Sequence, residues 1–279
     1  MARAAALAAK AEVSVDSETR LWQLVQQLGR QEETIDARQL LEQLALRPPQ
    51  VFVRHEEGNA MVPQSDVGAA ARFALREWDR RNAGRAALRH ARSGDQQLLD
   101  NYFAGGATTR AGIIDAVRAM PAKYLPVFSH EVEARLGDDD GALAAEFAHA
   151  LADSNLYVKV LAQSRSDVAI SALNRLTKTL DAPAALAVLK TALQRPEIAS
   201  AAAFAIGRLR PQLAAADELM WRLLADRTLG ATAAAILARE ANRHTLARLE
   251  AIAGQTDNWW LQQRARLALQ LAGNSRDKR

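Results

Sequence analysis

The sequence predicts an all-α protein whose larger, C-terminal part is an α-solenoid, a stack of helix pairs. Alanine, leucine and arginine dominate the 279 residues, so intrinsic preference favours helix over strand. From Ser166 onward, amphipathic segments with helical spacing recur roughly every 30 residues, which is typical of helical repeats. The length exceeds that of one compact core, so two domains or an elongated array are expected.

These patterns divide the chain into four segments. Residues 1–15 are expected to be a flexible N-terminus, and residues 16–107 a helical N-terminal region with one short β-hairpin. Residues 108–273 are expected to form the helix-pair solenoid, and residues 274–279 a polar tail.

The N-terminal region combines helices with the single hairpin signal of the chain. Two helices are predicted within residues 16–47, because leucine and valine recur there at helical spacing before two prolines. Two short extended segments around a Gly-Asn turn predict the hairpin near residues 51–62. The next helix is expected to be capped by Ser65 or Asp66, with interruptions at Gly84 and Gly94.

The repeat is clearest between Ser166 and Gly273. The segment Asp167–Leu176 matches Ser200–Leu209 at an offset of 33 residues, with small residues and leucines in the same places. Ala231–Glu240 and Leu261–Leu271 continue the series. One such helix pair cannot bury its own apolar face, so neighbouring pairs must stack.

Second helices are expected between these first helices, at Pro183–Leu193, Leu213–Leu224 and His244–Ala253. An earlier helix is predicted over Tyr124–Leu136. The register places Ile206 on the inward face of its helix, where an aspartate would be buried without a partner.

The segment Ala201–Leu209, Ala-Ala-Ala-Phe-Ala-Ile-Gly-Arg-Leu, resembles the HEAT-repeat family, in particular the short bacterial repeats of the PBS-lyase type. The resemblance covers roughly residues 108–273. It implies an α-solenoid with a binding surface, and it says little about the ligand. The usual Asp-x-x-Val-Arg start of the first helix is replaced by Ser166–Ala169, which lacks the arginine.

The charge of the chain is mildly basic and well mixed. There are 36 basic and 32 acidic residues, giving a net charge of +4, which is typical of an ordinary surface and not of a nucleic-acid-binding arm. The densest basic cluster lies in the N-terminal half, where a solvated helix face is expected and an anionic partner is the alternative. This cluster consists of Arg30, Arg38, Arg72, Arg76, Arg80, Arg81, Arg85, Arg89 and Arg92.

No pattern predicts a catalytic residue, a metal site or a cofactor, so a binding protein is expected before an enzyme. The absence of cysteine excludes disulfides and thiolate ligands. His130–Ala134 resembles the helical zinc-protease motif but has alanine in place of the second histidine ligand. The consecutive acids Asp138–Asp140 do not fit a calcium loop, and Asp140 is expected to cap a helix.

The leading functional prediction is a non-catalytic scaffold that presents a solenoid surface to a protein or peptide. Trp259 and Trp260 open the last predicted helix, and successive helical side chains diverge by about 100°, so one ring is expected to pack inward. The outward ring, with Arg264 one turn later, is the candidate partner-binding site. The alternative is that the pair only covers the end of the array.

Two other functions remain open. Helical repeats of this type resemble HEAT-like DNA glycosylases, which use arginines for the backbone and tryptophan with aspartate at the lesion. Trp221 with Asp226, or Trp78 with Asp79, supply those residue types here. The family name alone suggests the third possibility, a lyase or chromophore-attachment partner.

No run of 18 apolar residues is present, so no membrane span is predicted. The apolar part of Met1–Ala11 is too short and too weak for a signal peptide. A cytoplasmic protein is therefore expected, with a periplasmic location as the alternative if an upstream export signal was trimmed.

Overall fold

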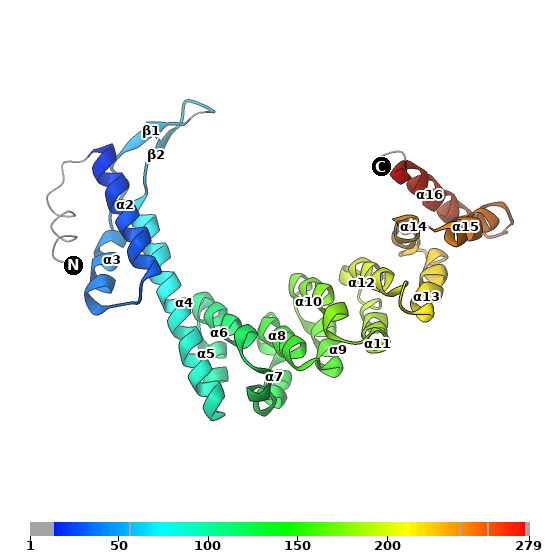
Figure 1. The fold of residues 1–279 in the computed structure, drawn as a ribbon, viewed down its shortest axis with the longest axis horizontal. Coiled ribbons are helices and arrows are strands. Elements are labelled where there is room, and N and C mark those ends of the chain that lie inside the picture. Colours follow the sequence, from blue (N-terminus) through cyan, green and yellow to red (C-terminus); the bar gives the residue numbers. More distant parts are fainter. Residues whose placement is uncertain (1–13, 56, 240–241, 256, 277–279) are drawn as a thin grey trace. The chain divides into compact units, whose positions relative to one another are not determined.

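The computed structural model is all-α apart from one two-stranded sheet (Figure 1), so the predicted fold class with its short hairpin is confirmed for the described residues. The structure describes residues 14–55, 57–239, 242–255 and 257–276. It divides into two compact units, Met1–Met120 (unit 1) and Pro121–Arg279 (unit 2). Residues 1–13 of the predicted flexible N-terminus and 277–279 of the predicted tail lie outside the described residues.

Unit 1 begins with helices that start where the sequence offers side-chain caps. Ser14, Thr34 and Asp66 each accept a hydrogen bond from the backbone N–H three residues later, which satisfies a donor that the helix leaves open. The elements are α2 (Val15–Arg30), α3 (Ile35–Ala45), β1 (Phe52–Arg54), β2 (Met61–Pro63), α4 (Val67–Ser93), α5 (Gln97–Ala104) and α6 (Ala107–Ala119).

The predicted hairpin is confirmed. Strands β1 and β2 pair antiparallel, with Val53 opposite Val62. The apolar faces of α2, α3 and α4 form the core of this part of unit 1, in which Val25, Leu41 and Trp78 are almost fully buried. The helices therefore meet along the stripes that the sequence predicts.

Helices α4 and α6 approach each other through two glycines. A Cβ atom on Gly112 would overlap the carbonyl oxygen of Arg80, and one on Gly84 would lie 3.0 Å from the Gly112 carbonyl oxygen. The predicted interruption at Gly84 is wrong, because this glycine serves close helix packing within a continuous α4. Since α6 packs along α4, unit 1 extends to Met120, whereas the sequence pattern places the boundary near residue 108.

Five of the nine arginines in the basic cluster bridge elements of unit 1. The cluster is therefore not one uniformly solvated helix face. The bridges join Arg38 to Glu33 and Asp79, Arg72 to the Ala45 carbonyl (2.6 Å), Arg80 to Asp115 (2.6 Å), Arg81 to the Gly29 carbonyl (2.5 Å) and Arg85 to Glu32 (2.6 Å).

Unit 2 consists of short turns followed by a succession of helices. The short elements are η1 (Ala122–Tyr124), η2 (Pro126–Phe128), α7 (Ser129–Ala134) and η3 (Leu136–Asp138). The longer helices are α8 (Ala142–Leu151), α9 (Ser154–Gln163), α10 (Ser166–Thr179), α11 (Ala182–Ala192), α12 (Pro196–Leu209), α13 (Ala214–Leu224), α14 (Gly230–Arg239), α15 (Arg243–Gln255) and α16 (Trp259–Arg276).

The first part of unit 2 differs from the sequence prediction. A single helix over Tyr124–Leu136 is wrong, because only Ser129–Ala134 is α-helical and the flanking residues form the 3-10 turns η1, η2 and η3, with Pro126 in the first turn of η2. Asp140 does not occupy the N-cap position of α8. Gly141 occupies it with a positive φ of 84°, while Asp140 accepts the Ala142 N–H at 3.0 Å.

Burial in the first helices of unit 2 follows the predicted register. Equivalent buried positions lie 33, 31 and 32 residues apart on α10, α12, α14 and α16. Ile206, predicted to face inward, is fully buried. The repeated buried residues are Ala169, Ala172, Leu173 and Leu176; Ala202, Ala205, Ile206 and Leu209; Ala233, Ile236 and Leu237; and Ala265 and Ala268.

The helices of unit 2 pack mainly on near neighbours in the sequence. Helix α12 contacts α10 before it and α14 after it, and α14 in turn contacts α16. Each second helix contacts the first helices on both sides of it in the sequence, as α11 does with α10 and α12, and α13 with α12 and α14 (Figure 1). An α-solenoid requires such packing between neighbouring helices. The assignment of unit 2 as an α-solenoid remains a prediction from the sequence.

Candidate functional site

Exposed aromatic side chains are the first pointer to a functional surface. The chain has five Trp, three Tyr and six Phe residues, and six of these fourteen are exposed. Aromatic rings bury a large apolar area when a partner covers them, so exposed rings are candidate contact residues. The exposed aromatic residues are Trp22, Phe52, Phe73, Phe204, Trp259 and Trp260.

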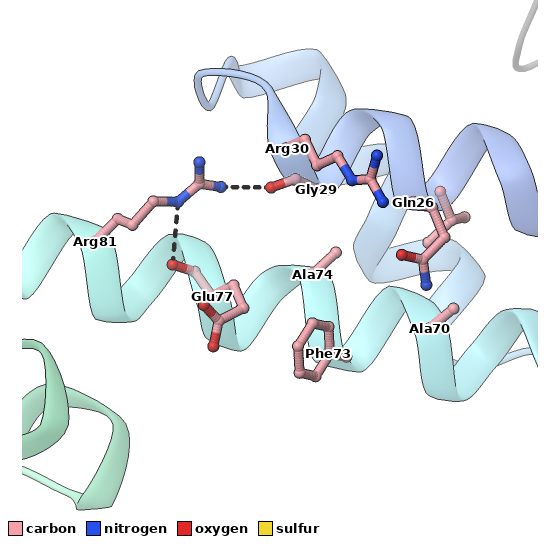
Figure 2. Close-up of a pocket in the computed structure, with 9 residues that line it drawn as sticks. Gln26, Gly29, Arg30, Ala70, Phe73, Ala74, Glu77 and Arg81 are labelled. Atoms are coloured by element: carbon pink, nitrogen blue, oxygen red, sulfur yellow. Dashed lines mark hydrogen bonds between the residues drawn. The ribbon is translucent and has the colours of Figure 1, made fainter.

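One of these rings, Phe73, lines a groove between α2 and α4 (Figure 2). The groove has a volume of about 470 Å³. Small residues form its base, and a Cβ atom on Gly29 would lie only 2.9 Å from the Cβ atom of Ala74. The groove is therefore shallow along the line where the two helices approach. The apolar lining residues are Val25, Gly29, Ala70, Phe73 and Ala74.

The polar rim of the α2–α4 groove comes from both helices. Arg81 is fixed, because its guanidinium donates to the Gly29 carbonyl oxygen at 2.5 Å and to the Glu77 carbonyl oxygen at 3.3 Å (Figure 2). Arg30 lies next to Gln26 on α2 and is exposed. Arg30 forms no ion pair with any residue that the structure describes, so its charge is open to a ligand.

The α2–α4 groove therefore offers an exposed ring, a floor of small apolar residues and one accessible guanidinium. Phe73 is 53% exposed, so an apolar ligand group packed on it would remove substantial area from water. The Arg30 guanidinium can donate two parallel hydrogen bonds to a carboxylate. This combination suits an apolar side chain with a carboxylate nearby.

The structure brings Trp259 and Trp260 together on the first turn of α16. Their ring centroids lie 4.7 Å apart in an edge-to-face arrangement, and the side chains are 58% and 55% exposed. The prediction that one ring packs inward is wrong. The fully buried positions of α16 begin only at Ala265, so the first turn lacks the core contacts that the register suggests.

Arg264 does not join the tryptophan pair as predicted from its spacing. Its guanidinium donates to the Arg227 carbonyl oxygen at 3.3 Å and lies against Gly230, where a Cβ atom would approach the Arg264 Cζ to 3.1 Å. Arg264 thus packs α16 on the start of α14. The candidate surface at this end of the chain reduces to the two rings.

The residues considered for nucleic-acid chemistry are engaged in packing. Trp78 is buried and donates its indole N–H to the Gln31 carbonyl at 3.1 Å. Trp221 is also buried and donates to Asp217 at 3.0 Å. Asp226 accepts backbone N–H groups at the start of α14. Both indole groups are therefore used in packing, and the Asp226 carboxylate caps the start of α14.

Neither a metal site nor a membrane span is found in the described ranges. No three histidine, aspartate or glutamate side chains there are grouped so that they could hold a metal ion. No described helix combines the length and apolar character needed to cross a bilayer.

The sequence prediction missed Phe73 and Phe204 as candidate contact residues. Each could have been predicted to be exposed, because each is a large aromatic residue outside the apolar stripe of its helix. In α4 that stripe includes Ala70, Ala74 and Trp78, which leaves Phe73 on the solvent side. In α12 the position of Phe204 falls between buried Ala203 and Ala205.

No protein-family model, curated protein or solved structure matches this chain, so the resemblance to HEAT repeats stays a prediction from the sequence.

Proposed function

We propose that the chain is a non-catalytic scaffold that binds a protein or peptide partner, with the α2–α4 groove as the main contact site. The supporting observation is the exposure of six of its fourteen aromatic side chains, one of which lines this groove. Aromatic residues and arginine are enriched at protein interfaces, and a few of them carry most of the binding energy.

The groove favours a partner that inserts one apolar side chain. That side chain would pack on Phe73, and a neighbouring carboxylate would accept hydrogen bonds from Arg30. Trp22 lies one helical turn before Gln26 on α2 and is 39% exposed, so it extends the same face.

Capture of the partner by the intact chain tests this proposal. The tagged chain and the variants Phe73→Ala and Arg30→Gln are used to recover cross-linked proteins from cells that carry the native gene, and the partner is then purified and titrated calorimetrically. Each variant is expected to weaken the partner's binding by about tenfold, the effect of losing one contact of about 1.4 kcal/mol.

Phe52→Ala provides the matched control, since Phe52 is 48% exposed but lies on the hairpin strand β1. This variant should bind as the wild type does. Equal binding by the wild type, Phe73→Ala and Arg30→Gln would exclude the groove as the contact site.

The tryptophan pair is tested in the same titration. Because both rings are exposed, Trp259→Ala and Trp260→Ala should each change the free energy of unfolding by no more than about 0.5 kcal/mol. If these variants lose the partner while Phe73→Ala keeps it, the contact site is the start of α16.

A further inference from the structure

One position of the helical repeat in unit 2 carries arginine in three successive first helices. The residues are Arg175 on α10, Arg208 on α12 and Arg239 on α14, at spacings of 33 and 31 residues. The first of them is used internally. Its Nη1 donates to the carboxylate of Glu146 at 2.7 Å, and that carboxylate side chain is only 7% exposed.

The other two arginines are exposed and keep their charge available. Arg208 donates to the neutral Asn174 side chain at 3.0 Å. Across the described ranges, no carboxylate is paired with Arg208 or Arg239. Both arginines lie in the last turn of a helix, where the negative end of the helix dipole favours a cation. The dipole carries only a partial charge, so each guanidinium can still pair with a carboxylate of a ligand.

Both arginines line a groove between α12 and α14. It has a volume of about 340 Å³ and is lined by Phe204, Gly207, Arg208, Ile236 and Arg239. Phe204 is 43% exposed. A Cβ atom on Gly207 would lie 2.6 Å from the Ile236 Cγ2, so any larger residue at 207 would crowd the groove floor.

We propose that this α12–α14 groove binds an acidic peptide segment. An apolar side chain of the peptide packs on Phe204 and Ile236, and carboxylates on either side of it accept hydrogen bonds from Arg208 and Arg239. Carboxylates match the planar guanidinium fork, and the volume, at the low end of the roughly 300–1,000 Å³ typical of ligand pockets, suits a side chain.

The same row of residues argues against a nucleic-acid backbone as the ligand. A phosphate track takes several cations in succession. Here Glu146 neutralises Arg175, and the equivalent position on α16 is Leu271, so the row offers two open arginines beside an apolar surface.

This inference rests on the proposed binding function and names the ligand class of one site in unit 2. Its test uses synthetic peptides, whereas the test of the α2–α4 groove uses a partner recovered from cells. A negative result for the α12–α14 groove can therefore be told apart from a negative result for the α2–α4 groove.

The experiment selects binders to the full chain from a display library of random twelve-residue peptides. The most enriched peptide is then synthesised with a fluorophore and titrated by fluorescence anisotropy. Wild type is compared with Phe204→Ala and with the double variant Arg208→Gln/Arg239→Gln. The control is Arg222→Gln/Arg266→Gln, which removes the same charge from exposed arginines that do not line the groove.

The selected peptides are expected to carry aspartate or glutamate on both sides of a leucine or phenylalanine. The Arg208→Gln/Arg239→Gln variant should weaken binding at least about tenfold and Phe204→Ala several-fold, while the control changes it less than about twofold. Circular dichroism confirms that each variant is folded.

Three results would overturn the proposal. The first is a selection that yields no binder or yields peptides without acidic residues. The second is equal weakening by the control variant. The third is that a twelve-nucleotide oligothymidine binds more tightly than the best peptide and that Arg208→Gln/Arg239→Gln weakens its binding. That result would assign the groove to nucleic acid.

Discussion

Units 1 and 2 are both helical, but different contacts hold them together. In unit 1, single polar bridges join helices far apart in the sequence, such as Arg81 to the Gly29 carbonyl and Arg38 to Asp79. In unit 2, the same buried stripe recurs every 31–33 residues and packs each helix on its neighbours. The packing partners of a helix in unit 2 can therefore be predicted from the repeated sequence pattern. The packing partners of a helix in unit 1 become known only from the folded structure.

The largest expected effect breaks the repeated stripe. Ile206→Asp places a carboxylate without a partner in a fully buried position, and should lower the free energy of unfolding of unit 2 by about 4 kcal/mol or more. Chemical denaturation followed by circular dichroism measures this. The control Ile206→Val should cost about 0.5–1.5 kcal/mol. A loss below that of the valine variant would show that Ile206 is not a core residue.

The second prediction concerns the buried bridge of unit 1. The Glu18 side chain is 1% exposed and pairs with Arg47, so Arg47→Met should cost about 3 kcal/mol by leaving the carboxylate unpaired. The double variant Glu18→Gln/Arg47→Met should recover part of that loss. Equal stability of the single and double variants in urea titrations would mean that the pair is not coupled.

A smaller effect is expected at the glycine crossing of α4 and α6. Gly112→Ala would push its Cβ atom against the Arg80 carbonyl oxygen and should cost about 1–3 kcal/mol through backbone displacement. Gly254→Ala, with no atom near the added Cβ, should be neutral or stabilising by up to about 1 kcal/mol. Thermal melting of both variants compares them, and similar shifts would contradict the close crossing.

The smallest effect is a pH dependence of unit 1. A hydrogen bond from Arg38 holds the pKa of Glu33 below its ordinary value of 4.5. Because the pKa is lower in the folded state than in the unfolded state, the ionised Glu33 stabilises the fold. This stabilisation is complete at pH values above the unfolded-state pKa and is lost as the pH falls through the folded-state pKa. For this partly screened pair we expect about 0.5 kcal/mol.

Melting between pH 6 and pH 2 measures that loss. Arg38→Gln should flatten the part of the profile below pH 4.5 that belongs to Glu33. If the melting profile of this variant at acidic pH equals that of the wild type, the Arg38–Glu33 pair does not contribute to the pH dependence.

The sequence predicts most of the helices and the register of unit 2, including the burial of Ile206, because local periodicity determines which side chains face inward. It also predicts the hairpin from its turn residues. The break at Gly84 is predicted wrongly, since only the crossing with α6 shows why a glycine is needed there.

The candidate site could be predicted only in part. Trp259 and Trp260 are adjacent in the sequence, and their exposure depends on what lies beneath the first turn of α16. The α2–α4 groove depends on how closely Gly29 and Ala74 approach, which no single segment contains. Grooves arise between elements, so periodicity within one element cannot locate them.

The neighbour-to-neighbour packing of unit 2 also has a consequence for how the chain folds. The bridge from Arg195 to the Leu161 carbonyl spans 34 residues, whereas the bridge from Arg81 to Gly29 in unit 1 spans 52. Shorter loops lose less entropy on closure, and local contacts speed folding. Each helix pair of unit 2 can therefore begin to pack during synthesis as soon as the next pair has left the ribosome, while α2 must wait for most of α4.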